Sequence, residues 1–347
     1  IVAAIPSLEW AEAAIDFGRA HRVPVVIDVR DPWPDGFLRA LPPVARLPGR
    51  FALGPYRRMA ARICRGADAL VGVSQGYLDW ALALAGRPQR AQDAVVPLGF
   101  EPDMISPAAL QNSIAALAER GINFDQPTCM FSGSFERSYD LETLVEAARR
   151  LSDIGRKNLQ FLLCGDGSKR AALERRARKL NLKNVHFIGW ADPAMLQAAA
   201  SVSSIGICAY AADATQGLPN KPFEYMAGRL AIVSSLQGEL AAFLKRHQCG
   251  ITYDAGSVNA LSNAVNRLVM NPPLLTTLRN TGYEAWQQNY RSEYLYAQFV
   301  DHLASLAPVL RRAARCRAPT AGSGAPECPG WQHGCDGSSA PASRFSR

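Results

Sequence analysis

The residues best suited to chemistry lie near position 220, where a loop containing Gly and Pro leads into a short predicted helix and a buried strand at 230–235. The helix carries Lys221 and, one turn later, Glu224. In an open α/β sheet, backbone N–H groups at such a helix start face an anion. Lys221 can neutralise a diphosphate, and Glu224 can accept hydrogen bonds from vicinal hydroxyls. The segment therefore predicts a nucleotide site, with a surface lysine and an ordinary first-turn acid as the alternative.

Two glycine turns follow predicted strands in the same half of the chain. Gly133-Ser134 comes after a strand at 129–132 and precedes Arg137. Glycine lets the backbone approach a phosphate closely, and an arginine fork suits two diphosphate oxygens. Gly165 repeats this arrangement after the next strand. We expect both turns to contribute to an anion cradle, with ordinary strand-to-helix turns as the alternative.

Strand and helix signals alternate along nearly the whole chain of 347 residues. This pattern predicts the α/β class, with parallel sheets covered by helices in two domains. The first domain is short, because a six-stranded half needs more than roughly 150 residues. It is therefore either reduced or truncated at its N-terminus. The expected divisions are a partial N-terminal domain at 1–105, a linker at 106–127, a C-terminal ligand-binding domain at 128–283, helices packing back on the first domain at 284–310, and a disordered tail at 311–347.

The net charge of +8 is unevenly distributed. Residues 37–67 hold seven arginines and no acid, interleaved with apolar residues such as Phe51 and Met59. A solvated basic face and an amphipathic helix on an anionic membrane surface both fit this pattern. No nucleic-acid motif accompanies the charge, so nucleic acid is not an expected partner, and no apolar run is long enough for a membrane span. The arginines are Arg39, Arg46, Arg50, Arg57, Arg58, Arg62 and Arg65.

The cysteines favour a reducing compartment, and hence a cytoplasmic location. Five are scattered and are most simply buried thiols: Cys64, Cys129, Cys164, Cys208 and Cys249. Three more lie in the tail, in a spacing that matches no zinc pattern. We therefore expect no metal.

The segment around Glu224 resembles the donor-sugar signature of the family 4 glycosyltransferases of GT-B fold. That signature is Glu, seven residues, Glu, and here its first position is Gln216, followed by Gly217-Leu218. The stretches SGSFERSYDLETL and GLPNKPFEYMA are most similar to those of bacterial capsule, O-antigen or exopolysaccharide transferases.

The resemblance implies two Rossmann-like domains, the N-terminal one on the acceptor side. It implies retaining transfer from a nucleotide-diphosphate sugar, with UDP as our choice of nucleotide and no metal or cofactor. The acceptor would be lipid-linked or another glycan, at the inner face of the plasma membrane. The catalytic residues implied are Arg137, Lys221 and Gln216, and the donor-binding residues are Gly133, Ser134, Gly165, Ile188, Gly217, Leu218, Asn220 and Glu224.

The chain also departs from the family pattern. Gln216 lacks the charge of the usual glutamate, although its amide can still bond sugar hydroxyls. Arg229 stands where a left-handed glycine is usual, at a cost on the order of 1 kcal/mol. Two other functions remain open: a nucleotide-sugar 2-epimerase, and a non-catalytic remnant that binds nucleotide sugars.

Overall fold

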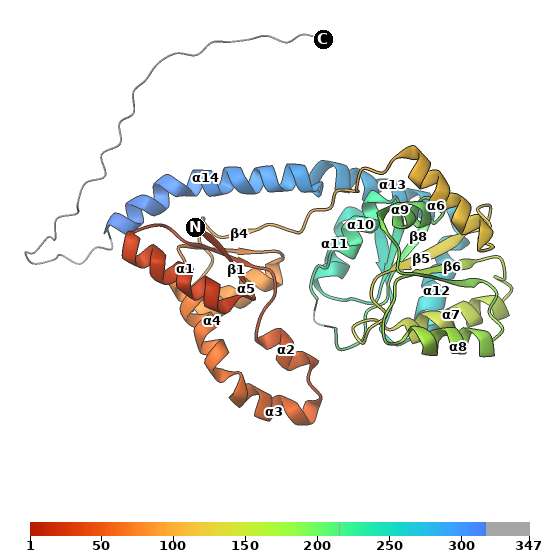
Figure 1. Ribbon diagram of the computed structural model, residues 1–347, viewed down its shortest axis with the longest axis horizontal. Helices are drawn as coiled ribbons and strands as arrows, with labels where there is room; N and C mark the ends of the chain where they lie inside the picture. Colours follow the sequence, from red (N-terminus) through yellow and green to blue (C-terminus); the bar gives the residue numbers. More distant parts are fainter. Residues whose placement is uncertain (215, 317–347) are drawn as a thin grey trace, which may run out of the picture.

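A computed structural model describes residues 1–214 and 216–316, without the side chains of residues 39, 40, 43 and 307–316. It contains two parallel sheets in two α/β halves (Figure 1). The prediction of this fold class is confirmed. In the described part of the chain, no helix is long and apolar enough to cross a membrane.

The N-terminal half has a four-stranded sheet in the order β1 (Val2–Ile5), β2 (Val26–Val29), β3 (Ala69–Gly72), β4 (Ala94–Val95). Side chains alternate between its faces. Ile27 and Leu70 pack under the helices α1 (Leu8–His21), α4 (Gly54–Gly66) and α5 (Gln75–Ala85). Between β2 and α4, the helices α2 (Asp35–Ala40) and α3 (Pro43–Ala52) project from the domain (Figure 1).

The other face of this sheet is covered by the long helix α14 (Ser292–Cys316), which returns from the C-terminal half (Figure 1). Leu306 of α14 is buried against Val26 and Val71. Two segments connect the halves, one after β4 and one before α14. Phe100 of the first forms a parallel bridge with Arg291 of the second. The helix α14 thus packs a segment that follows the C-terminal half against the first sheet.

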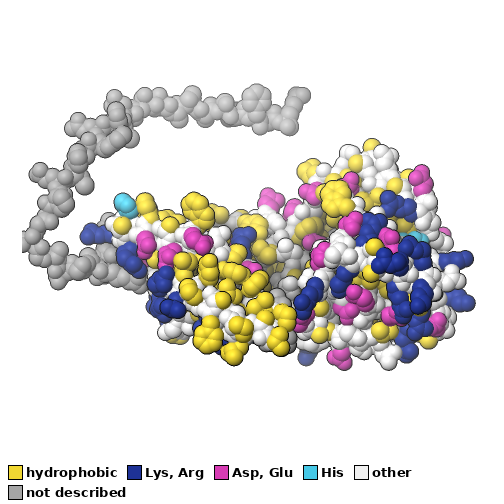
Figure 2. Space-filling view, turned by 60° about the horizontal axis from the view of Figure 1, so that its bottom comes forward, with side chains coloured by type: hydrophobic (Ala, Val, Ile, Leu, Met, Phe, Trp, Pro, Cys, Tyr) yellow, Lys and Arg dark blue, Asp and Glu magenta, His cyan; other side chains and the backbone are white. Residues whose placement is uncertain are grey.

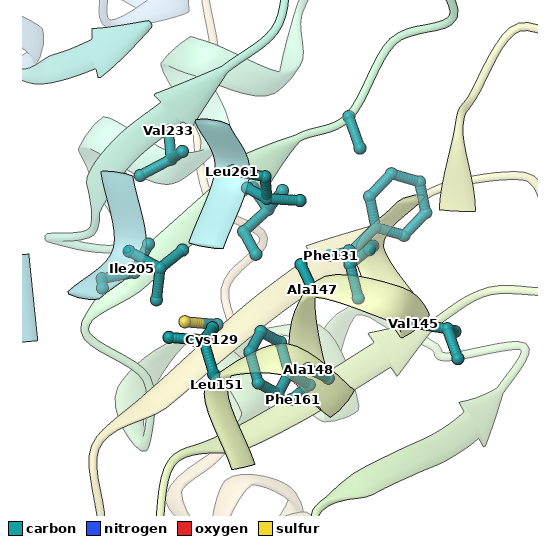
Figure 3. Packing of buried hydrophobic residues seen from close by; sticks show 14 of the residues in the cluster. Cys129, Phe131, Val145, Ala147, Ala148, Leu151, Phe161, Ile205, Val233 and Leu261 are labelled. Carbon is teal, nitrogen blue, oxygen red and sulfur yellow. The ribbon is translucent and has the colours of Figure 1, made fainter. Parts of the chain in front are cut away.

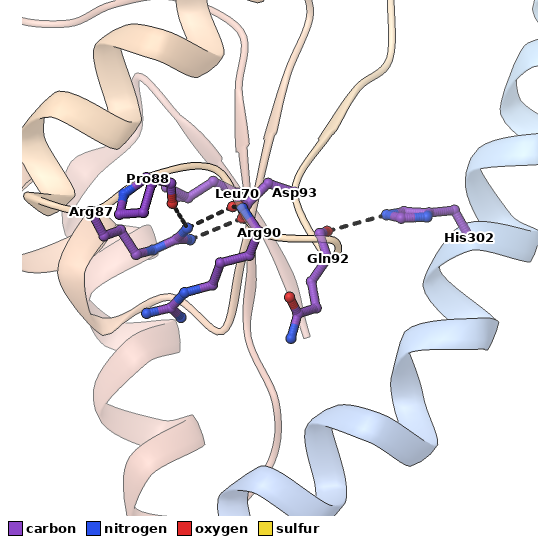
Figure 4. Close-up of polar contacts among 7 residues, drawn as sticks. All are labelled: Leu70, Arg87, Pro88, Arg90, Gln92, Asp93 and His302. Carbon is purple, nitrogen blue, oxygen red and sulfur yellow. Dashed lines mark hydrogen bonds and ion pairs between the residues drawn. The ribbon is translucent and has the colours of Figure 1, made fainter.

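A buried ion pair secures the loop before β4 (Figure 4). Arg87 Nη1 lies 2.6 Å from the carboxylate of Asp93, whose side chain is fully buried. Asp93 also accepts a hydrogen bond from the Leu70 N–H at 2.8 Å. On the same loop, the Gln92 carbonyl lies 3.3 Å from His302 of α14.

The C-terminal half has a six-stranded sheet in the order β10, β9, β8, β5, β6, β7. Phe131 packs on one face (Figure 3) and Met130 on the other. The face with Phe131 carries α7 (Leu141–Asp153), α8 (Arg170–Lys179) and α12 (Val258–Val269). The face with Met130 carries α6 (Pro107–Glu119), α9 (Pro193–Ser201), α10 (Lys221–Ala227) and α11 (Glu239–His247). The helix α13 (Pro272–Asn289) contributes side chains to both cores. The strands are β5 (Thr128–Ser132), β6 (Gln160–Cys164), β7 (Val185–Gly189), β8 (Ile205–Cys208), β9 (Ala231–Ser234) and β10 (Gly250–Thr252).

Several boundaries differ from the sequence expectation. The expected linker at 106–127 holds α6, whose Leu117 is fully buried in the C-terminal core. The expected boundary at 283 falls inside α13. The expected tail at 311–347 begins within α14, and its residues 317–347 lie outside the described residues. The five scattered cysteines are free and buried, as predicted.

Candidate functional site

The site lies at the point where the C-terminal sheet reverses its strand order. From β5 the chain proceeds through β6 and β7 in one direction, whereas β8, β9 and β10 follow in the other. Open parallel sheets bind ligands at the carboxyl ends of the strands beside such a switch point. Gly133 directly follows β5, and α10 follows the loop after β8. The fold therefore brings these two segments to one edge.

Lys221 and the Gly133 turn are in direct contact. A Cβ atom at Gly133, whose φ is +145°, would lie only 2.5 Å from Lys221 Nζ. The ammonium also lies over two aromatic faces, 5.3 Å from the ring centroid of Phe131 and 4.8 Å from that of Tyr139. Lys221 is only 8% exposed. A largely dehydrated cation beside a turn without side chains is suited to binding a phosphate oxygen.

Glu224 lies one helical turn further on and is half-buried. Burial raises its pKa above the usual value, opposed by the charge of Lys221 and by a hydrogen bond with Ser132. Next to it, the hydroxyl of Tyr225 accepts a 3.1 Å hydrogen bond from the Ser132 N–H and donates a 3.2 Å bond to the Ile207 carbonyl. Tyr225 thus fixes α10 to both strands of the switch point, and the carboxylate of Glu224 is held close to Lys221.

The loop before α10 contains an unpaired acceptor. Gln216 Oε1 is buried and has no hydrogen-bond partner in the described residues. Gly217, the next residue, passes close to Glu239, because a Cβ there would lie 2.6 Å from Glu239 Oε2. Leu218 packs against the core, and the exposed Asn220 precedes α10 without capping it through its side chain. The loop therefore offers one free amide oxygen among the residues predicted to contact the donor.

Three other predicted residues have structural surroundings of their own. Gly165, with φ at +148°, packs on the Gly133 turn so closely that a Cβ would overlap the Gly133 carbonyl. Ile188 is 6% exposed, and its carbonyl accepts a 2.7 Å bond from Arg120. Ser134 is exposed on the turn. Gly165 supports the shape of the turn, whereas the Ile188 side chain belongs to the core.

Arg137 is not among the contacts of Lys221. Its Nη2 lies 3.3 Å from the carboxylate of Asp213, and both side chains are largely exposed. Lys221, by contrast, contacts Phe131, Tyr139 and the Gly133 turn. Gly133, Lys221 and Glu224 are thus brought together, while Arg137 stands on the surface with an acid beside it.

Sequence reasoning did not identify three residues that meet opposite this loop. The Gln75 N–H, at the start of α5 in the N-terminal half, donates a 2.7 Å hydrogen bond to Glu239 Oε1. The neighbouring Ser74 is 1% exposed, and its hydroxyl has no hydrogen-bond partner in the described residues. A Cβ at Gly217 would lie 3.4 Å from this hydroxyl. A serine before a helix was a visible signal, but its position against Gly217 depends on the tertiary fold.

Comparison with known proteins shows similarity to glycosyltransferases. Residues 126–271 match the family model described as "Glycosyl transferases group 1". The lipopolysaccharide core biosynthesis glycosyltransferase LpsE of Rhizobium meliloti (strain 1021) is 26% identical over 183 residues, which are 52% of this chain and 51% of that protein. The 2-deoxystreptamine N-acetyl-D-glucosaminyltransferase of Niallia circulans is 26% identical over 161 residues, 44% of this chain and 38% of that protein. The chain therefore spans about half the length of these relatives, or less.

Solved structures show the same fold over most of the chain. The structure of Anabaena Alr3699/HepE in complex with UDP has a TM-score of 0.68 at 16% identity, covering 88% of this chain and 79% of that one. WaaG, a glycosyltransferase involved in lipopolysaccharide biosynthesis, has a TM-score of 0.55 at 15% identity, covering 87% and 80%. The two parallel α/β halves therefore have the GT-B fold.

Proposed function

We propose that this chain, a GT-B glycosyltransferase by fold and by the family match of residues 126–271, is a retaining family 4 enzyme. It transfers a sugar from a UDP-sugar to a lipid-linked or glycan acceptor during cell-surface polysaccharide synthesis. The reaction takes place at the cytoplasmic membrane face, with the basic segment at 39–65 toward anionic lipid. The names of LpsE and of the UDP-bound HepE support the pathway and the nucleotide.

The observation that carries this proposal is the contact of Lys221 with the Gly133 turn, next to Glu224. As the bond between sugar and diphosphate breaks, negative charge grows on the diphosphate leaving group. Lys221 is already in place and mostly shielded from water, so it stabilises this charge without reorganisation. A fixed ammonium supplies positive charge without a metal.

In this proposal, Glu224 and Gln216 bind different parts of the donor. The Glu224 carboxylate accepts hydrogen bonds from the ribose hydroxyls. The unpaired amide oxygen of Gln216 accepts one from a hydroxyl of the transferred sugar. Arg137 is less well placed to bind the diphosphate, since it would first have to break its ion pair with Asp213.

Calorimetry with UDP tests the donor site. Glu224→Ala should weaken UDP binding by about 1.5–3 kcal/mol, the contribution of a charged hydrogen bond. Glu284→Ala, an exposed acid on α13, is the matched control and should bind as the unchanged chain does. Unchanged UDP affinity in Glu224→Ala would refute the assignment.

A turnover assay separates the three candidate functions. A UDP-sugar offered with a lipid-linked acceptor should yield a product that keeps the anomeric configuration of the donor. Interconversion of sugar epimers without any acceptor would identify an epimerase instead. Tight UDP binding with no product from any acceptor would indicate a binding protein.

A further inference from the structure

A basic cavity lies in the projecting part of the N-terminal half, away from the Lys221 site. The helices α3 and α4 meet at Leu53 and enclose a cavity of about 670 Å³ together with α2. Among the side chains that the structure describes, five arginines line it, two from α3 and three from α4: Arg46, Arg50, Arg57, Arg58 and Arg65.

The single carboxylate in this cavity is already engaged. Asp35 accepts hydrogen bonds from Arg57 Nε at 3.3 Å and from Trp80 Nε1 at 3.0 Å. The described lining residues of the cavity thus include five guanidinium groups and one carboxylate, an excess of positive charge. Guanidinium groups converging on one space favour a ligand with several phosphate oxygens.

The sixth arginine of the segment with a described side chain, Arg62, lies elsewhere. Arg62 Nη2 is 2.6 Å from Glu12 of α1. Arg62 therefore does not belong to the arginines of the cavity, because its guanidinium pairs with Glu12 of α1. The cavity residues of α4 follow helical spacing at 54, 57, 58, 61 and 65, whereas Ile63 and Cys64 face the core.

Exposed apolar side chains stand beside the cavity on α3. Val44, Leu47 and Phe51 are 87%, 65% and 79% exposed. Because successive residues of an α-helix are rotated by about 100° around its axis, these three side chains form one stripe. The stripe lies roughly a third of a turn around the helix from Arg46 and Arg50. Figure 2 shows hydrophobic side chains gathered on this side of the N-terminal half, with Lys and Arg side chains along the edge. A helix with an apolar stripe flanked by arginines is the pattern of an element that lies in a membrane interface.

We propose that the α3–α4 cavity binds the phosphate or diphosphate group of a membrane lipid, while Val44, Leu47 and Phe51 enter the apolar layer. A soluble phosphate would use the arginines but not the apolar stripe, which is why the lipid is the occupant. The inference extends the membrane-facing part of the proposed function. It is tested separately from that function, because UDP calorimetry involves no lipid.

The experiment is flotation of the full chain with vesicles of phosphatidylcholine, with or without phosphatidylglycerol. Binding should require phosphatidylglycerol. Arg50→Gln with Arg58→Gln removes one arginine from each wall and should lower the partition constant about thirtyfold, given the usual effect of a basic residue near an anionic surface. The charge-matched control is Arg90→Gln with Arg175→Gln, two exposed arginines outside the cavity. The control should bind as the unchanged chain does.

Two further measurements distinguish the source of the phosphate. Leu47→Ser with Phe51→Ser keeps all the charge and should also reduce vesicle binding at least severalfold. UDP affinity should stay unchanged in both double variants, which shows that they are folded. Equal binding to neutral vesicles, or equal losses in the cavity and control variants, would overturn the proposal. A third result would also overturn it: tight binding of inorganic pyrophosphate that is lost in the Arg50/Arg58 variant, together with normal vesicle binding by the Leu47/Phe51 variant. That result would assign the cavity to a soluble ligand.

Discussion

Glu239 of the C-terminal half accepts a 2.7 Å hydrogen bond from the Gln75 backbone N–H, at the first turn of a helix in the N-terminal half. The same carboxylate lies against the position of a Cβ at Gly217 in the predicted donor loop. One side chain therefore connects the N-terminal half to the loop that would enclose the donor.

Glu239→Ala should loosen this connection. The loss of a carboxylate at a helix N-terminus costs about 0.5–2 kcal/mol. Because Glu239 and Gln75 belong to different halves, this loss should weaken the contact between the halves. Small-angle X-ray scattering should show a larger radius of gyration for Glu239→Ala than for the unchanged chain, with Glu239→Gln in between. An identical scattering curve for all three would mean that the halves are held together by other contacts.

The buried pair of Arg87 and Asp93 should matter far more than exposed pairs. Although burial alone would raise the pKa of Asp93, hydrogen bonds from Arg87 and two backbone N–H groups lower it overall. Asp93→Asn should reduce the free energy of unfolding by about 3 kcal/mol in urea titrations.

Asp153→Asn, in an exposed pair with Arg149, is its control and should cost less than about 1 kcal/mol. The contribution of Asp93 is present above the pKa of the unfolded chain and is lost as pH falls through its lowered folded pKa. The Asp93→Asn difference should therefore shrink in acid. Equal effects of the two substitutions at neutral pH would contradict this account.

Glu224 should have the opposite pH dependence. Its folded pKa is raised from the usual 4.5, with burial as the largest cause. Its contribution to stability is thus fully present below the unfolded pKa and lost as pH rises through the folded one. In urea titrations, Glu224→Gln should gain stability relative to the unchanged chain as pH rises from acid to neutral. A difference that does not vary with pH would show that the carboxylate is not perturbed by burial.

Gly165 should tolerate no side chain. Gly165→Ala combines an unfavourable positive φ with a direct overlap on the Gly133 carbonyl, so it should cost about 3 kcal/mol or more. Gly121→Ala shares a positive φ but meets no atom within 4 Å, and should cost about 1 kcal/mol. Denaturant unfolding of both variants checks this, and similar losses would mean that the Gly133 turn moves aside easily.

Local features of the molecule could be predicted from the sequence. Short apolar runs between helical patterns predicted the parallel strands of both halves. Such runs mark parallel strands because each strand is buried on both faces of its sheet. Arg229 was expected in a left-handed conformation and has φ at +54°, with its guanidinium 3.7 Å from the centroid of the Tyr283 ring. The turn at Gly133 and the helix at Lys221 were identified by local chemistry in the same way.

Features that depend on long-range contact could not be predicted. Gln75 and Glu239 are 164 positions apart, so no local pattern indicates their hydrogen bond. Arg137 looked free for an anion because Asp213 is distant in sequence. The sequence predicts a linker where α6 lies, because the helix follows an irregular stretch containing Pro. Leu117 of α6 is buried only through packing on the C-terminal half.

The most direct test of the account is the effect of Lys221→Met on the binding of UDP and of uridine. Methionine keeps much of the length of the lysine side chain and removes the charge, and the exposed Lys245→Met is the control. Since Lys221 is assigned to the diphosphate, calorimetry should show UDP affinity falling about 10- to 100-fold while uridine affinity and the control stay unchanged. Unaltered UDP binding, or an equal loss for UDP and uridine, would contradict the placement of the diphosphate between Lys221 and the Gly133 turn.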